Sequence, residues 1–330
     1  MPTVALTFNP AGFGDDALVA LKKAKFTVKT AKKAEGMTRA EVLKHIRGAD
    51  AVISLLTDKV DGAFFDAAGK QLKINANYAV GFDNVDLDAA KKRNIIVTNT
   101  PCDEVNESVA EHAFALMIGL AHKIVEADTY ARALKYKGWT PNLLLGTDLG
   151  GKTLGLVGLG RIGSALARRA HQGFGMKIVY SDARKNEDAE KKYSAKRLSM
   201  NKVLEVSDFV SLHCPLLPST RHLISTEELA RMKKTAFLVN TARGPVVDEK
   251  ALLRALRTGR IAGAGIDVFE CEPAIDCDIT DKLELKSFTN VILTPHIGSA
   301  TTESRQGMAR VAAANVVAVL TGKAALTPAK

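Results

Sequence analysis

Aromatic side chains are scarce in this 330-residue chain: they make up 5% of the residues, with a single tryptophan. Charge is unbalanced, because 46 lysines and arginines stand against 36 aspartates and glutamates, a formal net charge of +10. A basic protein can bind a polyanion, but here the basic residues are scattered and no aromatic residues are interleaved with them for base stacking. We therefore expect no nucleic-acid partner, and the positive charge suits small anionic substrates better.

Cysteines are few as well. Cys102, Cys214, Cys271 and Cys277 show no C-x-x-C spacing. Disulfide frameworks and zinc sites need paired or closely spaced cysteines. The sequence therefore predicts reduced thiols, no metal site and a cytoplasmic protein.

Long apolar runs are missing too. No stretch reaches the 18 consecutive apolar residues expected of a membrane-spanning helix. The first ten residues, MPTVALTFNP, have no basic segment and only a short apolar run. We expect neither a membrane span nor a signal peptide.

What the chain does have is a regular alternation of short apolar runs and helical patterns between residues 150 and 297. The runs recur roughly every 24 to 32 residues, which predicts βαβ units and a mostly parallel sheet covered on both faces. The predicted strands are Thr153–Val157, Lys177–Ser181, Phe209–His213, Ala236–Asn240, Ala262–Val268 and Val291–Thr294.

The first hundred residues repeat this alternation on a smaller scale and predict a second α/β domain. Its strands are expected at Thr3–Phe8, Phe26–Thr30, Ala51–Ser54, Ile74–Ala76 and Ile95–Thr98. One helical run, from Asn106 to about Leu134, is long enough to cross between the domains. An amphipathic helix at Glu303–Leu320 is expected to return to the first domain.

A glycine motif, Gly158-x-Gly160-x-x-Gly163, lies between a predicted strand and an alanine-rich helix. In that context the motif binds the pyrophosphate of a dinucleotide. Gly158 permits the tight turn, Gly160 lets the backbone approach the ligand, and Gly163 allows close packing of the helix. The helix N-terminus adds free N–H donors and the positive end of a dipole. The sequence therefore predicts a dinucleotide-binding domain.

Asp182 ends the next predicted strand, 19 residues beyond Gly163. Its carboxylate can accept hydrogen bonds from both ribose hydroxyls but would repel a 2′-phosphate, so NAD is favoured over NADP. Arg184 and Lys185 follow and could bind such a phosphate, which keeps NADP as an alternative.

Ligands of an open parallel sheet bind beyond the carboxyl ends of its strands. Several ionisable groups are expected to meet there, beside the nicotinamide. The strand ends carry Gly158, Asp182, His213-Cys214-Pro215, Thr241-Ala242-Arg243, Asp267 and His296.

Three residues in this region suit hydride transfer to a 2-oxo acid. Arg243 can hold a carboxylate through two hydrogen bonds and polarise the neighbouring carbonyl. Glu272 precedes His296 by 24 residues. A carboxylate bonded to one ring nitrogen fixes the tautomer and leaves the other nitrogen to donate a proton. The sequence offers no nucleophile elbow and no Cys/His pair for covalent catalysis.

The chain resembles the D-isomer-specific 2-hydroxyacid dehydrogenases over nearly its whole length, most closely the glyoxylate/hydroxypyruvate reductase branch. The resemblance rests on YAVGFDNVDLDAA, IIVTNTP, GKTLGLVGLGRIG, LHCPL, LVNTARGPVVDEKAL, GAGIDVFECEP and TPHIGSAT. It implies two Rossmann-like or flavodoxin-like α/β domains. The NAD(P)-binding domain, residues 101–298, would be inserted within a discontinuous substrate-binding domain, residues 1–100 and 299–330.

The resemblance also assigns roles. Arg243, Glu272 and His296 match the catalytic arginine, glutamate and histidine of the family, and Arg243 and His296 would also contact the substrate. The substrate carboxylate would be held by Leu55, Val80 and Gly81. The cofactor would contact Gly158, Gly160, Arg161, Ile162, Gly163, Asp182, His213, Cys214, Pro215, Thr241, Ala242, Arg243, Asp267, His296, Gly298 and Val109 or Ser108. Members are usually homodimers, in which Trp139 would reach the partner's active site or serve as a buried anchor.

Two segments depart from the family pattern. The connection from Gly163 to Asp182 is one residue longer than the commonest spacing, at AHQGFG, and we interpret it as a loop insertion that leaves Asp182 at its strand end. The stretch AIDCDITDKLELKSFTN between Glu272 and His296 is also lengthened and would reshape the rim of the substrate site.

The predicted activity is NAD(P)H-dependent reduction of glyoxylate or hydroxypyruvate. D-lactate dehydrogenase and D-3-phosphoglycerate dehydrogenase are the alternatives. Formate oxidation needs no proton donor, so Glu272 argues against it. A dinucleotide-sensing corepressor built on the same fold is the alternative from a different class, because such a protein can keep the catalytic trio.

Overall fold

The computed structural model describes residues 1–12, 14–31, 37–272 and 284–329. The chain divides into two compact units, Met1–Val105 with Ala300–Lys330 (unit 1) and Asn106–Ser299 (unit 2). Unit 2 is thus inserted into unit 1, with cuts at 105/106 and 299/300 where the sequence predicted 100/101 and 298/299. Most of the lengthened stretch after Glu272, with Cys277, lies outside the described residues.

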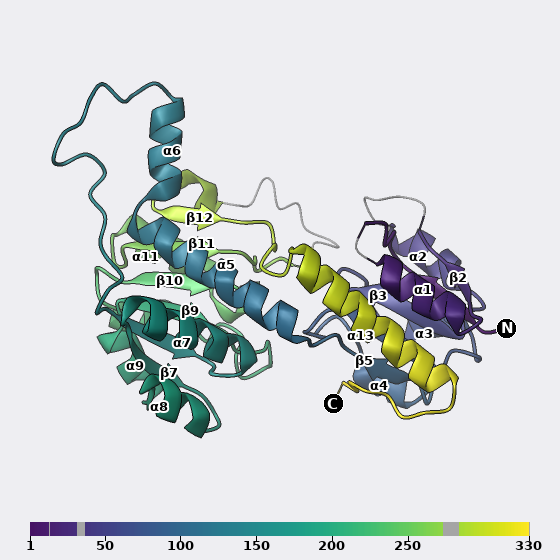
Figure 1. Cartoon of the computed structure of the whole chain (residues 1–330). Coiled ribbons are helices and arrows are strands. Elements are labelled where there is room, and N and C mark those ends of the chain that lie inside the picture. Colours follow the sequence, from purple (N-terminus) through teal and green to yellow (C-terminus); the bar gives the residue numbers. More distant parts are fainter. Residues whose placement is uncertain (13, 32–36, 273–283, 330) are drawn as a thin grey trace. The chain divides into compact units, whose positions relative to one another are not determined.

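Unit 1 contains a parallel sheet of five strands in the order β2-β1-β3-β4-β5 (Figure 1). This is the flavodoxin-like order. Helix α13 packs on α1 and β4, so the predicted return of the C-terminal helix to this domain is confirmed. The strands are β1 (Thr3–Leu6), β2 (Thr27–Lys29), β3 (Ala51–Leu55), β4 (Ile74–Tyr78) and β5 (Ile96–Thr98), and the helices are α1 (Asp15–Lys23), α2 (Arg39–His45), α3 (Gly62–Ala68), α4 (Leu87–Lys91) and α13 (Thr302–Leu320).

Unit 2 contains a parallel sheet of seven strands in the order β12-β11-β10-β9-β6-β7-β8. Counted from β6, this is the Rossmann order 3-2-1-4-5-6 extended by one strand, and its switch point lies between β6 and β9. The strands are β6 (Thr153–Val157), β7 (Lys177–Ser181), β8 (Lys196–Arg197), β9 (Phe209–Leu212), β10 (Phe237–Asn240), β11 (Gly263–Ile266) and β12 (Val291–Leu293). The two-residue strand β8 was not predicted, because it is too short to show alternation.

Helices cover both faces of this sheet. This buries the apolar side chains of each strand, which alternate between the two faces. Leu154 and Leu156 of β6 pack in a core with α5 and α7, whereas Val157 packs in a second core with α10 and α11. The helices are α5 (Asp103–Ala121), α6 (Ile124–Arg132), α7 (Arg161–Phe174), α8 (Glu187–Tyr193), α9 (Met200–Val206), α10 (Thr226–Arg231) and α11 (Glu249–Arg257). The predicted fold class is confirmed.

The single helical run predicted from Asn106 to Leu134 is wrong. Helices α5 and α6 meet at a bend of 61°. Lys123 lies at the bend with φ +53°, a left-handed conformation through which an α-helix cannot continue. Among the described residues no single helix is long and apolar enough to cross a membrane, and α5 and α6 pass that test only as a bent pair.

His213 follows β9, and its backbone lies against the glycine-rich turn at Gly158. Its backbone approaches Gly158 so closely that a Cβ on this glycine, whose φ is +92°, would lie 2.8 Å from the His213 carbonyl carbon. Its Nε2 lies 2.9 Å from the Oγ of buried Ser211. Desolvation by burial lowers the pKa of His213 from 6.5 to about 4.

We predict that His213 makes the protein acid-labile. As the pH falls below 6.5, the unfolded chain binds a proton that the folded ring accepts only near pH 4, so the free energy of unfolding decreases across that window. Between pH 7 and pH 5 the loss due to this ring is about 2 kcal/mol. Urea unfolding of wild type and His213→Gln at both pH values should show a smaller loss in the variant. Equal losses would contradict this assignment.

Candidate active site

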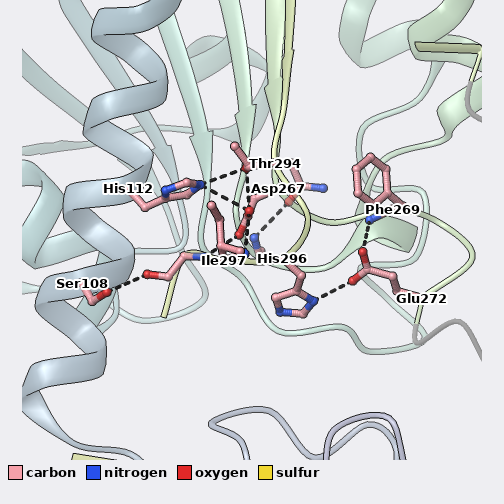
Figure 2. A network of polar contacts seen from close by, with 11 residues as sticks. Ser108, His112, Asp267, Phe269, Glu272, Thr294, His296 and Ile297 are labelled. Carbon is pink, nitrogen blue, oxygen red and sulfur yellow. Dashed lines mark hydrogen bonds and ion pairs between the residues drawn. The ribbon is translucent and has the colours of Figure 1, made fainter. Parts of the chain in front are cut away.

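Asp267 lies just after β11, and its carboxylate accepts hydrogen bonds from the segment that carries His296 (Figure 2). Its side chain is 1% exposed. Oδ1 accepts hydrogen bonds from the Thr294 hydroxyl (2.6 Å) and the Ile297 N–H (2.9 Å), and Oδ2 accepts one from the Gly298 N–H (2.9 Å). The Asp267 carbonyl accepts the His296 N–H at 2.8 Å. One residue therefore fixes the loop from 294 to 298.

Asp267 is ionised in this setting. Burial by itself raises the pKa of a carboxyl group, but hydrogen bonds from His112, Thr294 and the Ile297 N–H outweigh it, and the net pKa of Asp267 is lowered. The site therefore contains a buried negative charge that is fully hydrogen-bonded.

Two side chains of α5 complete this network. His112 Nε2 lies 3.0 Å from Thr294 Oγ1 and 3.3 Å from Asp267 Oδ1. Because Thr294 donates its only hydroxyl hydrogen to Asp267, it accepts the one on His112 Nε2. Ser108, one turn earlier, donates its hydroxyl to the Gly298 carbonyl (2.8 Å).

The sequence prediction missed His112 and Thr294. A signal was present, because Ser108 and His112 are polar residues at i and i+4, and therefore share one face of a helix that is otherwise mostly apolar there. Nothing in the local pattern, however, indicated that their partners would be 190 and 182 residues away.

His296 and Glu272 form the predicted pair. His296 Nδ1 lies 2.6 Å from Glu272 Oε2, and Glu272 Oε1 accepts the Phe269 N–H at 3.3 Å (Figure 2). The backbone of His296 has φ +54°, a strained conformation for a residue with a side chain, and its bond to Asp267 holds it there. Within the described part of the chain, Nε2 has no partner. That nitrogen is therefore available to a further hydrogen-bond partner.

Arg243 lies in the turn after β10. Its Nη1 donates to the Ala242 carbonyl (2.8 Å), and its own carbonyl accepts from the Asn240 amide (2.9 Å). The next residue, Gly244, touches the backbone before Glu272: a Cβ on Gly244 would lie 1.8 Å from the Phe269 carbonyl oxygen. Only glycine fits there, so the arginine and glutamate loops are packed backbone to backbone.

The glycine-rich turn has the features of a pyrophosphate site. A Cβ on Gly160 would meet no atom within 4 Å, so the space above this residue is open to a ligand. The 14-residue helix α7 begins at Arg161 with no side-chain cap on its first N–H groups. Thr241 Oγ1 is buried and, among the described residues, has no hydrogen-bond partner. These residues fit a dinucleotide.

Asp182 immediately follows β7, as predicted. The AHQGFG segment is not a loop insertion, however: α7 continues through Phe174, so the segment forms the last turn of that helix and its Gly175 C-cap. Oδ2 accepts the Leu159 N–H (2.7 Å) and Oδ1 accepts the Arg184 N–H (2.9 Å). Each oxygen keeps a second lone pair for a ribose hydroxyl. Lys185 is engaged elsewhere, in ion pairs with Glu187 (3.6 Å) and Glu190 (3.3 Å).

The predicted substrate residues Leu55, Val80 and Gly81 lie in unit 1, at the end of β3 and just after β4. Across the described ranges, no group of three or more His, Cys, Asp and Glu side chains could hold a metal ion. Cys102 and Cys214 form no disulfide bond within the described ranges.

The chain is similar to known proteins over most of its length. The family model "D-isomer specific 2-hydroxyacid dehydrogenase, NAD binding domain" matches residues 114–298. A glyoxylate reductase of Korarchaeum cryptofilum is 51% identical over 283 residues, 86% of this chain and 83% of the relative. One of Thermococcus kodakarensis is 45% identical over 309 residues, 92% of this chain and 90% of the relative.

A solved structure is similar as well. D-lactate dehydrogenase from Aquifex aeolicus, complexed with NAD and lactic acid, is 33% identical with a TM-score of 0.82, covering 97% of this chain and 96% of that one. Unit 2 is accordingly an NAD-binding domain, and the protein is an NAD-dependent oxidoreductase that acts on 2-oxo and 2-hydroxy acids. The chain belongs to the D-isomer-specific 2-hydroxyacid dehydrogenase family.

Proposed function

We propose that the physiological substrate is glyoxylate, with hydroxypyruvate as a second substrate, and that His296, Glu272 and Arg243 carry out the reaction. The relatives that are 51% and 45% identical are named glyoxylate reductases, which supports the substrate. The observation that carries the catalytic assignment is the 2.6 Å hydrogen bond between His296 Nδ1 and Glu272, beyond the strand ends of a dinucleotide-binding sheet.

In the reaction, the reduced nicotinamide, when bound, supplies a hydride to the carbonyl carbon. His296 donates the Nε2 proton to the carbonyl oxygen, so that C=O becomes CH–OH and the ring ends neutral. Glu272 accepts a hydrogen bond from the Nδ1–H throughout the reaction, and its negative charge stabilises the imidazolium before the proton is transferred. Arg243 holds the substrate carboxylate and stabilises the negative charge that develops on oxygen.

Leu55, Val80 and Gly81 are assigned to the substrate carboxylate, and Asp182 to the adenine-side ribose of NAD. NADP remains the alternative cofactor through Arg184, and pyruvate remains the alternative substrate, since a similar structure holds NAD and lactic acid. The thiols of Cys102 and Cys214, which form no disulfide bond within the described ranges, fit a cytoplasmic location.

Purified protein should oxidise NADH most efficiently with glyoxylate in a panel that includes hydroxypyruvate, pyruvate and phosphohydroxypyruvate. The loss of NADH absorbance gives kcat/KM for each acid, and a parallel series with NADPH should be at least about tenfold less efficient if Asp182 meets the ribose hydroxyls. A higher kcat/KM for pyruvate would establish the lactate alternative. No turnover with any oxo acid would refute the enzyme assignment.

His296→Ala should lower kcat by about 10²- to 10⁴-fold, the usual contribution of a general acid, and leave the Kd for NADH within about twofold. Glu272→Gln should lower kcat less, because an amide can still orient the ring but cannot stabilise its charge. His171→Gln, at the far end of α7, is the matched control and should retain wild-type rates. Normal turnover in His296→Ala would rule out its role as proton donor.

We infer that the enzyme is a homodimer joined through the dimer arm, residues 124–145. Contiguous exposed apolar side chains mark protein–protein contacts. Six large apolar residues of the arm are exposed: Ile124 (50%), Val125 (49%), Leu134 (79%), Tyr136 (55%), Trp139 (79%) and Leu145 (64%). A second copy of the chain is the partner that would cover them.

Sedimentation should give a mass of twice 35.3 kDa for the wild type. The double variant Trp139→Asp/Leu145→Asp should sediment as a monomer, because two buried charges at an interface are costly. Leu217→Asp, a 49% exposed leucine outside the arm, is the control and should stay dimeric. A dimer of unchanged affinity in the double variant would show that the arm is not the interface.

A further inference from the structure

Two asparagine side chains hold the loop after β4 from inside unit 1. Asn77, on β4, is fully buried and donates from Nδ2 to the Gly81 carbonyl (3.0 Å). Asn99, just after β5, donates from Nδ2 to the Val80 carbonyl (2.7 Å). Both carbonyls of this dipeptide are therefore bound by side-chain amides of the same unit.

A third amide extends this arrangement to the loop after β3. Asn84 donates from Nδ2 to the carbonyls of Leu55 (3.1 Å) and Asp58 (2.9 Å). It is also joined to Asn77, whose Nδ2 lies 3.0 Å from Asn84 Oδ1 and whose Oδ1 lies 3.2 Å from Asn84 Nδ2. We call Asn77, Asn84 and Asn99 the amide clamp.

The clamp determines the direction of the neighbouring N–H groups. In a trans peptide the C=O of one residue and the N–H of the next point in opposite directions. With the Val80 and Gly81 carbonyls held by the clamp, the N–H groups of Gly81 and Phe82 point the other way. Neither donates a hydrogen bond to any described residue, and both residues are only half-buried.

Successive backbone N–H groups that point to one side form a site for an anion. Such a site is selective only if the peptide planes cannot rotate, because rotation would present the carbonyl oxygens to the anion instead. Amides are suited to this task. An amide donates hydrogen bonds to the carbonyls and carries no charge. An ionised aspartate could not donate to a carbonyl, and its negative charge would repel a nearby anion.

We propose that the amide clamp, by binding the carbonyls of Leu55, Val80 and Gly81, positions the backbone assigned to the substrate carboxylate. The Gly81 N–H, with the Phe82 N–H beside it, is thereby directed to that carboxylate, so that Asn77, Asn84 and Asn99 are positioning residues for substrate affinity. The proposal rests on the proposed function, since it takes the anion to be the substrate. It makes the clamp a determinant of KM, not of hydride or proton transfer.

Asn99→Ala and Asn84→Ala test the clamp. Each should raise KM for glyoxylate about tenfold, the effect of losing one or two bonds that fix a peptide plane. In both variants kcat should stay within about threefold of the wild type, and KM for NADH should not change. Asn99→Asp should raise the glyoxylate KM further than Asn99→Ala, because it adds a negative charge.

The matched control is Asn75→Ala. Asn75 lies on the same strand as Asn77 and, like it, is fully buried. Its amide donates to the Ser54 hydroxyl (3.0 Å), which donates in turn to Asn77 Oδ1 (3.2 Å), but it binds no carbonyl of either loop. It should lose stability as a buried-amide variant does while keeping its glyoxylate KM within about twofold. If the clamp only stabilised the fold, the glyoxylate KM would rise in all three alanine variants, including Asn75→Ala, in proportion to the stability that each one loses. That result would overturn the proposal.

Hydrogen exchange provides a readout independent of turnover. In the wild type, oxalate should slow exchange in a peptide spanning residues 79–86, and in Asn99→Ala the same oxalate concentration should not. Unchanged protection in the variant would overturn the clamp. A wild type that reduces no oxo acid would refute the proposed function, whereas an active wild type with unchanged KM in Asn84→Ala and Asn99→Ala would refute the clamp alone.

Discussion

The position of the loop that carries His296 depends on one buried charge, the carboxylate of Asp267. It accepts hydrogen bonds from a side chain and two backbone N–H groups in the loop that follows β12, and so joins the ends of two neighbouring strands. A buried carboxylate without such partners would cost several kcal/mol. With these hydrogen bonds the Asp267 carboxylate is stable in the interior, and it holds His296 in place through the residues on either side of it.

The strained backbone of His296 is a consequence of its contacts with Asp267. A φ of +54° is unfavourable for a histidine, and it persists because the N–H of this residue is bound to the Asp267 carbonyl while the next two N–H groups are bound to the Asp267 side chain. The ring of His296 is bonded to Glu272 through Nδ1, and the backbone contact at Gly244 brings the Arg243 turn against the loop that precedes Glu272. The positions of His296, Glu272 and Arg243 are therefore fixed by contacts within unit 2 itself.

In both units, polar side chains bind the backbone of the loops that follow the parallel strands. Loops beyond parallel strands have no ladder to satisfy their backbone groups, so a buried polar side chain has to fix them. In unit 2 an anion accepts from N–H groups of the loop, and in unit 1 three amides donate to carbonyls of the loops. A side chain that accepts binds the N–H groups of its loop, and a side chain that donates binds the carbonyls and leaves the N–H groups unbound.

The amino-acid sequence by itself determined the parallel α/β fold, the glycine-rich turn, and the pairing of Glu272 with His296, since strand period, glycine spacing and family motifs are all local patterns or recognisable segments. Only the tertiary structure decided the bend at Lys123, the short strand β8, and the hydrogen-bond partners of His112, Thr294 and the amide clamp. A left-handed residue or a two-residue strand leaves no periodic signal. Hydrogen bonds between residues as far apart as Ser108 and Gly298 exist only once the sheet has brought the two segments together.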